Sequence, residues 1–584
     1  MENKQLGTTW TIYGGNNPDN IGANCGVLLH RHSKYDRPTR IMLDCGALFA
    51  PKGADVDAVF PDIREYLGTS KSYPKIDALL LSHAHEDHIG GMVHLARAGY
   101  SFPPIYASKG TLELLKSSLK LAGVDLDKDE WKYIDENGDK KELFIEIKSR
   151  EAINFKGVEI EAINMSHTTV GPLGFHILTS IDGKVEAGIF HPGDYHTRKV
   201  RVGEGFEEAA LRDLASRKPI DIVFLDSTST DSGDEYTVTH EEAVKNLTDV
   251  IKQHPEKQVI TTVISSSIQN LAIHLDAARK TNRKVFIDGY RLKLAFKAMQ
   301  DAGIREYDDI IFWGDANAYL KKYDHKDRYI VGSGAFAEEH STLMKLIQQE
   351  KIVPSNDKKN KKKKKNIKKT GHPYFTIDNK TLFIFGQRGV INYDELCKAA
   401  NVTSSLGAVV FVNDAKKPLK GFPTAKIQSS GHANRKESKQ LLSIIAEAQN
   451  NPNEIICIPV HGNPDQLENT KKLAEEVGMG VFLAQNSDIL QFNNRLNGKV
   501  AKIDELEPKP WMAVKQLDDN TSVHDVFIYY LVDNDYNITE EWKKIVQKNP
   551  RNDNSWNAIN PSNNSTDEAK SSKNNRNFRK SYSR

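Results

Sequence analysis

Six consecutive residues, His83-Ala84-His85-Glu86-Asp87-His88, constrain this chain more than any other feature. They follow the apolar run 76–81, whose length and bounding turn signals predict a buried strand. Alternate histidines on an extended loop can hold one metal ion, while Asp87 and His88 turn toward a second. Imidazole nitrogens and carboxylate oxygens suit zinc, with manganese as an alternative. The motif therefore predicts a metal site at a strand end, and Gly90-Gly91 is expected to let the chain turn tightly into the helix that follows.

Two other apolar runs also end at an acidic residue. Residues 40–43 precede Asp44, and residues 222–225 precede Asp226. Short runs bounded by turn signals are typical of buried strands, and open sheets usually carry their sites where the strands end. In each case the polar chemistry begins where a predicted strand ends.

From Thr239 onward the pattern becomes helical. The predicted elements are a helix at 241–253, a strand at 259–264, a helix at 268–280 and a strand at 284–287, and apolar strands resume at 381–385, 408–412 and 455–460. Alternation of helices and strands is typical of a parallel sheet. The alternation over 241–287 is therefore predicted to be a parallel α/β unit inserted in the chain.

Length and charge set the outline of the molecule. With 584 residues, two or three domains are expected. The formal net charge is only +2, so any nucleic-acid footprint must be local. The lysine-rich run 358–369 cannot form a core and is predicted to be a disordered loop. Residues 551–584, rich in Asn, Ser, Lys and Arg, are predicted to be a disordered tail.

The sequence contains no apolar run of about 18 or more residues, so no membrane partner is expected. Residues 1–10 lack the basic and apolar segments of a secretory signal. The cysteines, Cys25, Cys45, Cys397 and Cys457, form no CxxC pair. Cys45 and Cys457 lie in apolar runs, where a buried reduced thiol is the ordinary interpretation. These features favour a reducing, cytoplasmic compartment.

The HxHxDH motif after a strand resembles that of the metallo-β-lactamase superfamily, which implies an α/β fold built as an αββα sandwich. By this resemblance, Asp44 matches the first motif, an acid that braces the ligand loop. His167 matches the third motif. Asp194 matches the fourth, the carboxylate that bridges both metals.

Three other histidines lie near these motifs. His176 competes with His167 for the third motif, but it sits inside an apolar run and is interpreted as a packed histidine. His191 and His196 flank the fourth motif. They are interpreted as residues behind the ligands or on the surface.

Three later segments resemble motifs of the β-CASP nucleases, a branch of this superfamily. They are Asp226-Ser227-Thr228, Ser430-Gly431-His432-Ala433 and Pro459-Val460-His461-Gly462. In this order and spacing they are similar to those of the ribonuclease J family, over roughly residues 10–490. The resemblance implies a metallo-β-lactamase domain at 1–226 and 428–492, a β-CASP insert at 227–427, a small C-terminal region at 493–550 and the tail at 551–584.

The chain departs from the ribonuclease J pattern in four places. Residues 332–336, Gly-Ser-Gly-Ala-Phe, stand where that family has a GSQGE-like run, and residues 386–389, Gly-Gln-Arg-Gly, replace a proline-rich return segment. The lysine-rich run lengthens the insert, and the region after about residue 490 is hard to match. The first two departures concern residues expected to take part in RNA binding, and the last concerns the expected oligomeric state.

Metal ligands are implied by the same resemblance. One metal would be held by His83, His85 and His167, and the other by Asp87, His88 and His461, with Asp194 between them. The expected cofactors are two Zn2+ per chain, with Mn2+ or Mg2+ as alternatives.

Hydrolysis of a phosphodiester leaves a ribose oxygen that must be protonated. His432 is the candidate general acid, because an imidazole can carry that proton near neutral pH. Asp226 would orient it, so that His432, Asp226 and the ligand Asp87 form the catalytic set. The turn Gln428-Ser429-Ser430-Gly431-His432 offers hydroxyls, an amide and backbone N–H groups that could cradle the substrate phosphate.

The resemblance implies a ribonuclease of RNA processing and decay, acting as a 5′-to-3′ exonuclease with endonuclease activity. The expected partner is single-stranded RNA carrying a 5′-monophosphate, and the expected assembly is a homodimer or higher oligomer. The lysine-rich run either adds salt-sensitive attraction to RNA or is a solvated spacer.

Three alternatives stay open. A DNA nuclease of the β-CASP group is the nearest, although His461 favours RNA because DNA-directed relatives often carry Val there. A small-molecule hydrolase, such as a lactamase or thioester hydrolase, would need neither the insert nor the Ser430-Gly431-His432 return. A non-catalytic RNA-binding protein would not need the full ligand set.

Overall fold

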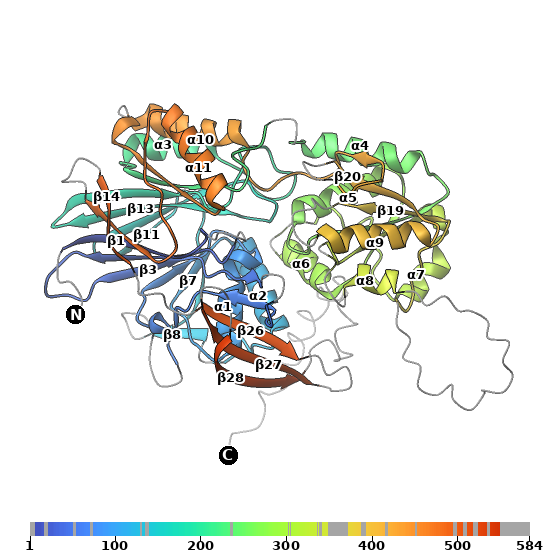
Figure 1. Ribbon diagram of the computed structural model, residues 1–584, viewed down its shortest axis with the longest axis horizontal. Coiled ribbons are helices and arrows are strands. Elements are labelled where there is room, and N and C mark those ends of the chain that lie inside the picture. The colour runs from blue at the N-terminus through green and yellow to red at the C-terminus, as the bar shows by residue number, and fades with distance from the viewer. Residues whose placement is uncertain are drawn as a thin grey trace, which may run out of the picture.

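Two large sheets stacked face to face form one lobe of the protein, and a second lobe carries a third sheet, as a computed structural model shows (Figure 1). The residues that the structure describes are 6–16, 22–50, 54–69, 74–128, 131–134, 139–233, 237–301, 303, 305–335, 337, 341–348, 372–386, 393–414, 418–449, 452–493, 499–505, 511–517, 524–533 and 538–548. The lysine-rich run 358–369 and the predicted tail 551–584 lie outside them. Within these ranges, no helix is both long and apolar enough to span a bilayer.

The first sheet has eight strands in the order β10-β7-β6-β3-β2-β1-β24-β25. Their bounds are β1 Gly7–Gly14, β2 Cys25–Arg31, β3 Thr39–Leu43, β6 Ala78–Leu80, β7 Ile105–Ala107, β10 Phe144–Glu146, β24 Asp488–Asn493 and β25 Lys499–Glu505. Strands β3 and β6 run parallel, so the polar residues that follow them meet at one edge of the sheet. Strand β24 pairs with β1, so chain from beyond residue 487 completes a sheet that begins at residue 7.

The second sheet has seven strands in the order β11-β12-β13-β14-β15-β22-β23. Their bounds are β11 Ala152–Phe155, β12 Val158–Asn164, β13 Leu173–Ile181, β14 Lys184–His191, β15 Ile222–Asp226, β22 Ile456–Val460 and β23 Gly480–Val481. Strands β14, β15 and β22 are parallel. The segments that follow them therefore gather at one edge.

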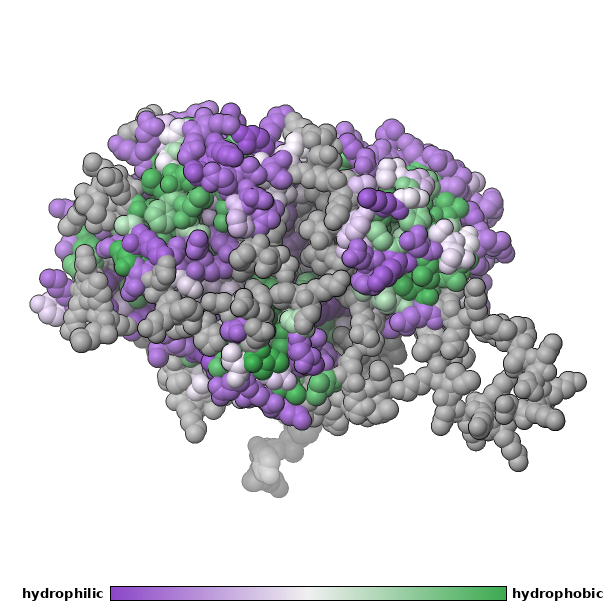
Figure 2. Space-filling model, viewed as in Figure 1, coloured by the Kyte–Doolittle hydropathy of each residue, from purple (hydrophilic) through white to green (hydrophobic). Residues whose placement is uncertain are grey.

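Apolar side chains from both sheets interlock in the space between them. Trp10 and Leu28 come from the first sheet, and Phe175, Ile189 and Phe224 from the second. Helices cover the outer faces, with α1 (Glu86–Arg97) and α2 (Lys109–Leu121) on the first sheet and α3 (Glu208–Arg217), α10 (Arg435–Gln449) and α11 (Pro464–Glu476) on the second. Hydrophilic side chains face outward over α3, α10 and α11 (Figure 2), as amphipathic helices require. This arrangement confirms the predicted αββα sandwich.

The second lobe is the inserted α/β unit. Its sheet is parallel throughout, in the order β17-β18-β16-β19-β20-β21. The strands are β16 Gln258–Thr262, β17 Lys284–Ile287, β18 Arg328–Gly332, β19 Thr381–Phe385, β20 Val409–Asn413 and β21 Thr424–Ala425. Helices α4 (His240–Lys252), α5 (Ile268–Lys280) and α6 (Tyr290–Asp301) pack on one face, and α7 (Ala316–Lys322), α8 (Thr342–Ile347) and α9 (Tyr393–Ser405) on the other. The predicted parallel α/β insert is confirmed.

A small antiparallel sheet closes the described chain, in the order β28-β27-β26-β5-β4. Its strands are β4 Leu48–Phe49, β5 Ala58–Phe60, β26 Trp511–Leu517, β27 His524–Val532 and β28 Ile538–Lys548. It packs under α1, where the Arg97 guanidinium lies 3.9 Å from the Phe527 ring centroid and the Tyr529 hydroxyl donates to the His94 carbonyl. The C-terminal region thus supports the helix that carries Asp87 and His88.

Candidate metal centre

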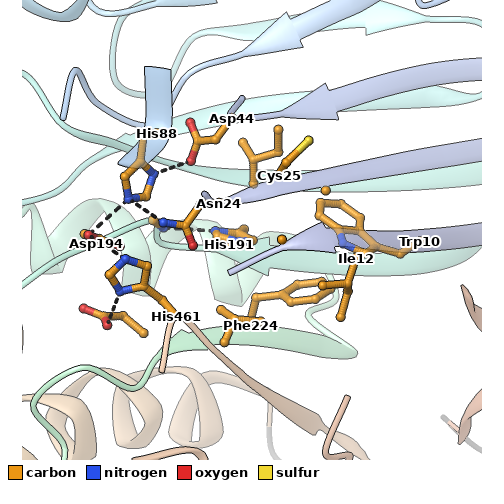
Figure 3. A pocket seen from close by; sticks show the side chains of 16 residues that line it. Trp10, Ile12, Asn24, Cys25, Asp44, His88, His191, Asp194, Phe224 and His461 are labelled. Carbon is orange, nitrogen blue, oxygen red and sulfur yellow. Dashed lines mark hydrogen bonds and ion pairs between the residues drawn. The ribbon is translucent and has the colours of Figure 1, made fainter. Parts of the chain in front are cut away.

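Asp44 braces the loop that carries the histidine motif. It follows β3 with a φ of +57°, a left-handed conformation that Asp tolerates better than most residues. Its buried carboxylate accepts the Ser82 N–H and the Ser82 hydroxyl, both at 2.8 Å, and the Nδ1–H of His88 at 2.7 Å. Because His88 donates from Nδ1, its Nε2 atom is left to face Asp194, as Figure 3 shows.

Glycines let α1 approach the loop after β3. Gly90 and Gly91 lie inside α1, so they do not form a tight turn before it, and that sequence expectation is wrong. A Cβ at Gly91 would lie 2.5 Å from the Gly46 carbonyl oxygen. A Cβ at Gly46 would overlap the Asp87 carbonyl oxygen. The glycines therefore serve close backbone contact, which brings Asp87 and His88 against the end of β3.

His83, His85 and His167, named here the first ligand group, bring their ring nitrogens together. One nitrogen from each lies within 4.8 Å of the others. The His167 Nε2 and His85 Nδ1 atoms are 3.1 Å apart, and the buried His83 Nε2 atom has no hydrogen-bond partner among the residues that the structure describes. The His167 Nδ1–H donates to the Gly431 carbonyl at 2.7 Å, which leaves Nε2 for the centre.

Burial keeps the first ligand group neutral. It is the main cause that lowers the pKa of His83 and of His167 well below the ordinary value, and the neighbouring histidines lower both further. Burial lowers the pKa of His85 to about 4. Neutral imidazoles offer the nitrogen lone pairs that a metal ion requires.

Asp87, His88 and His461, named here the second ligand group, lie around Asp194. The Nε2 atoms of His88 and His461 lie 3.2 and 3.7 Å from the Asp194 Oδ2 atom. The His461 Nε2 atom also lies 3.1 Å from the Asp87 Oδ2 atom. His83 Nε2 of the first ligand group is 3.9 Å from the same Asp194 oxygen. Asp194 therefore stands between the two groups.

The second ligand group is charged, unlike the first. Burial would raise the pKa values of Asp87 and Asp194, but neighbouring histidines hold both below the ordinary value. Burial would lower the pKa of His461, but Asp194, Asp226 and Asp87 raise it to about 10. Two ligand groups that share a carboxylate, with nitrogen and oxygen donors and an unpartnered buried Nε2, fit divalent metal ions.

His432 and Asp226 form a pair beside this centre. The His432 Nδ1 and Asp226 Oδ2 atoms are 2.8 Å apart, and the His432 ring stacks on that of His461 with centroids 5.5 Å apart. Burial lowers the pKa of His432, but Asp226 and Asp194 outweigh it and raise that pKa. Asp194, Asp226, His432 and His461 also bring ligand atoms within 4.8 Å of one another, so geometry permits either a proton-donating or a metal-binding His432.

The turn predicted to bind phosphate lies against the centre. A backbone N–H of Ser429 donates to Asn270 at 3.0 Å and the His432 N–H to the Ser430 hydroxyl at 3.3 Å, so these two donors already have acceptors. The Oε1 atom of Gln428 is buried without a hydrogen-bond partner in the described structure. Gly431 touches the first ligand group, because its carbonyl accepts from His167 as described above.

The three other histidines are all at least half-buried. His176 donates from Nε2 to the Pro219 carbonyl at 2.8 Å, which agrees with a packed histidine. His191 lines a cavity of about 30 Å3 behind His88 and Asp194 (Figure 3), and its Nδ1 accepts the Gly193 N–H. His196 is only 4% exposed, so the surface alternative is wrong for it.

Three contacts with the candidate ligands involve residues that the sequence analysis did not single out. The Asn24 Nδ2 atom lies 3.0 Å from the His88 Nε2 atom, and Asn16 accepts the His461 N–H at 3.1 Å. The Thr228 hydroxyl lies 2.6 Å from the His461 Nδ1 atom. All three residues lie in loops that only the tertiary fold brings to the centre. Only Thr228 has a clue in the sequence, because it directly follows Asp226-Ser227.

Two family models match the chain. Residues 39–260 match the β-lactamase superfamily domain, and residues 424–484 match the Zn-dependent metallo-hydrolase RNA specificity domain. The first match contains His83 to Asp226 of the centre, and the second contains His432 and His461. The crystal structure of a protein of unknown function from Enterococcus faecalis V583 shares the fold, with a TM-score of 0.51 at 14% identity over 83% of this chain and 100% of that one.

Curated relatives agree with these matches. Ribonuclease J of Mycoplasma pneumoniae is 23% identical over 77% of this chain and 69% of its own length. Ribonuclease J2 of Bacillus subtilis is 22% identical over 75% and 68%. Ribonuclease J of Helicobacter pylori is 25% identical over 79% of this chain, which spans 59% of that relative. By sequence and by the two matched domains, the chain is similar to the ribonuclease J proteins and to the β-lactamase superfamily domain.

Proposed function

We propose that this protein is a metal-dependent ribonuclease that hydrolyses RNA phosphodiester bonds. The observation that carries the proposal is the convergence of both ligand groups on Asp194, with the His432–Asp226 pair beside them. The RNA specificity domain match over residues 424–484 supports RNA as the substrate, because that segment contributes both His432 and His461.

The proposed cofactors are two Zn2+ ions, one in each ligand group, with Asp194 between them. When bound, such ions would supply Lewis-acid activation of water and stabilise negative charge on the phosphodiester. Asp87 belongs to the second ligand group. Loss of its carboxylate would therefore reduce metal binding and also the catalysis that depends on that metal.

The protein's own residues would position the substrate and move the proton. His432 donates a proton to the leaving ribose oxygen, and Asp226 orients the His432 ring through its Nδ1 atom. The turn at Gln428-Ser429-Ser430-Gly431-His432 lies where a phosphate of the bound strand would pass.

The finer activity rests on the resemblance to ribonuclease J. The protein would act as a 5′-to-3′ exonuclease with endonuclease activity on single-stranded RNA, with a preference for a 5′-monophosphate. It would assemble as a homodimer or larger oligomer, with 1–226 and 428–492 as the metal-binding domain, 227–427 as the insert and 493–550 as a small C-terminal region.

One comparison tests this function. Purified protein with added Zn2+ or Mn2+ is given 5′-monophosphate RNA, 5′-triphosphate RNA and single- and double-stranded DNA of the same sequence. The expected result is fastest cleavage of 5′-monophosphate RNA. Equal or faster cleavage of DNA would make it a DNA nuclease, and cleavage of neither would remove the nuclease assignment. The His83→Ala variant serves as the contamination control.

A further inference from the structure

The Thr228 hydroxyl lies between the metal centre and the His432–Asp226 pair. It is 2.6 Å from the His461 Nδ1 atom, 2.7 Å from the Asp226 Oδ1 atom and 3.0 Å from the His461 carbonyl oxygen. The other Asp226 oxygen is the one that contacts His432. Thr228 therefore links His461 to the Asp226–His432 pair by contacts shorter than the direct one, since the His461 Nδ1 and Asp226 Oδ1 atoms are 3.4 Å apart.

The chemistry of these groups fixes the direction of each bond. A carboxylate and a carbonyl only accept, so the single hydroxyl hydrogen of Thr228 must point to Asp226 or to the His461 carbonyl. The His461 Nδ1 atom must then donate to the hydroxyl oxygen. A ring that keeps its hydrogen on Nδ1 would offer the Nε2 lone pair to a metal ion that displaces the hydrogen there, and Nε2 is the atom that faces Asp87 and Asp194.

The backbone at Thr228 is held independently of its hydroxyl. Its N–H donates to Asp226 at 2.9 Å, and its carbonyl accepts from the Gln466 amide at 2.8 Å. An Asx-type turn of this kind keeps its shape when the side chain changes. Removing the hydroxyl therefore changes the partner of His461 and leaves the turn in place.

We propose that Thr228 is a positioning residue, whose hydroxyl selects the ring form of His461 that binds the second metal and joins that ligand to the Asp226–His432 pair. The inference rests on the proposed function. Hydrogen-bond partners behind a metal ligand typically change metal affinity or activity by about 10–100-fold when removed. The first ligand group does not contact Thr228 in the described structure, so its affinity should not change.

The test is a Thr228→Val variant, which keeps the side-chain shape and loses the hydroxyl, with Thr228→Ser as the rescue. Thr230→Val is the matched control, because Thr230 lies in the same turn and its buried hydroxyl contacts Ser227 and Thr470 and none of the ligands. Stepwise Zn2+ affinities are measured by competition with a chromophoric chelator, and thermal unfolding of the metal-free proteins checks the fold.

Thr228→Val should weaken one of the two Zn2+ affinities, that of the second ligand group, by about 10–100-fold and leave the other unchanged. Thr228→Ser and Thr230→Val should bind both ions with affinities within about twofold of those of the unmodified protein. This difference is much smaller than the change expected for Thr228→Val. The proposal is overturned if Thr228→Val keeps both affinities, if Thr230→Val shows the same loss, or if Thr228→Ser fails to restore binding. An unmodified protein that binds no Zn2+ would instead overturn the proposed function.

Discussion

The Asp44 carboxylate lies 2.7 Å from the Nδ1 atom of His88, and it thereby aims the Nε2 atom of that ring at Asp194 from 3.2 Å. The two residues come from different strand ends, since Asp44 follows β3 and His88 belongs to α1 after β6. The same carboxylate also holds Ser82, which begins the ligand loop. One buried acid thus orients a ligand and fixes the loop that carries two more.

Asp44→Asn should weaken the second metal site. An amide of the same size loses the charge and offers only one acceptor for three donors, so His88 is no longer held. We expect about 10–100-fold lower affinity for the second Zn2+ ion. Zn2+ titration against a chelator measures it, with Asp62→Asn as the control because Asp62 pairs with Arg64. Unchanged Zn2+ binding by Asp44→Asn would remove the bracing role.

His83→Ala should bind about one metal ion per chain where the unmodified protein binds about two, because each ligand group would hold one. The measurement is elemental analysis of protein purified without chelator. His176→Gln is a control that removes a buried histidine outside both groups. If the unmodified protein contains no metal, and added metal gives no gain in activity, the metal centre itself is refuted.

Gly431→Ala should disturb the first ligand group. A Cβ at this position would lie 2.5 Å from the Cε1 atom and 2.8 Å from the Nδ1 atom of His167, closer than such atoms approach. The ring must shift, so the metal affinity of the first ligand group should weaken while that of the second ligand group changes less. Stepwise Zn2+ affinities report this directly. A variant with both affinities unchanged would show that the turn moves aside instead.

His432→Ala should keep both metals and bind RNA, but cleave it about 10²–10⁴-fold more slowly, as expected on removal of a general acid. His461→Ala should lose activity together with metal occupancy. An activated aryl phosphodiester, whose leaving group needs no protonation, should partly restore the rate of His432→Ala. If that variant loses metal, or shows the same defect on both substrates, His432 is a ligand or phosphate-binding residue.

Deletion of residues 358–369 should weaken RNA binding and flatten its salt dependence, because lysines that contact phosphates release counterions. The measurement is RNA affinity over a salt titration. Cleavage of a substrate of a few nucleotides should be unaffected, which separates this effect from damage to the metal centre. Identical salt slopes with and without the run would assign it the role of a spacer.

Local patterns predicted much of the fold. Helix α5 occupies Ile268–Lys280, the same bounds as the sequence prediction, because an apolar face and flanking turns mark both ends. The predicted strand at 76–81 is shortened to Ala78–Leu80, although Ile76 and Leu81 are buried. An apolar run predicts which residues are buried. The strand ends cannot be predicted from it, because they depend on which residues of the neighbouring strands form hydrogen bonds with it.

Other features could not be predicted from local patterns. Strand β28 carries Glu540, Glu541, Lys543 and Lys544, a charged stretch that forms a strand only because β27 pairs with it. The close approach of α1 to Gly46 likewise depends on tertiary contact. Within the site, the histidines and acids stand in dense motifs, but Asn16 and Asn24 lie in loops where nothing local sets them apart.

The strand order has a consequence for when the protein can act during its own synthesis. Asp87 and His461 contact each other across 374 residues of sequence, and β24, which follows His461, pairs with the first strand. A nascent chain that has emerged only as far as the insert carries every earlier ligand yet lacks His432, His461 and the strands that hold the sandwich closed. The proposed metal centre can therefore be completed only after β24 (Asp488–Asn493) has been synthesised and has paired with β1.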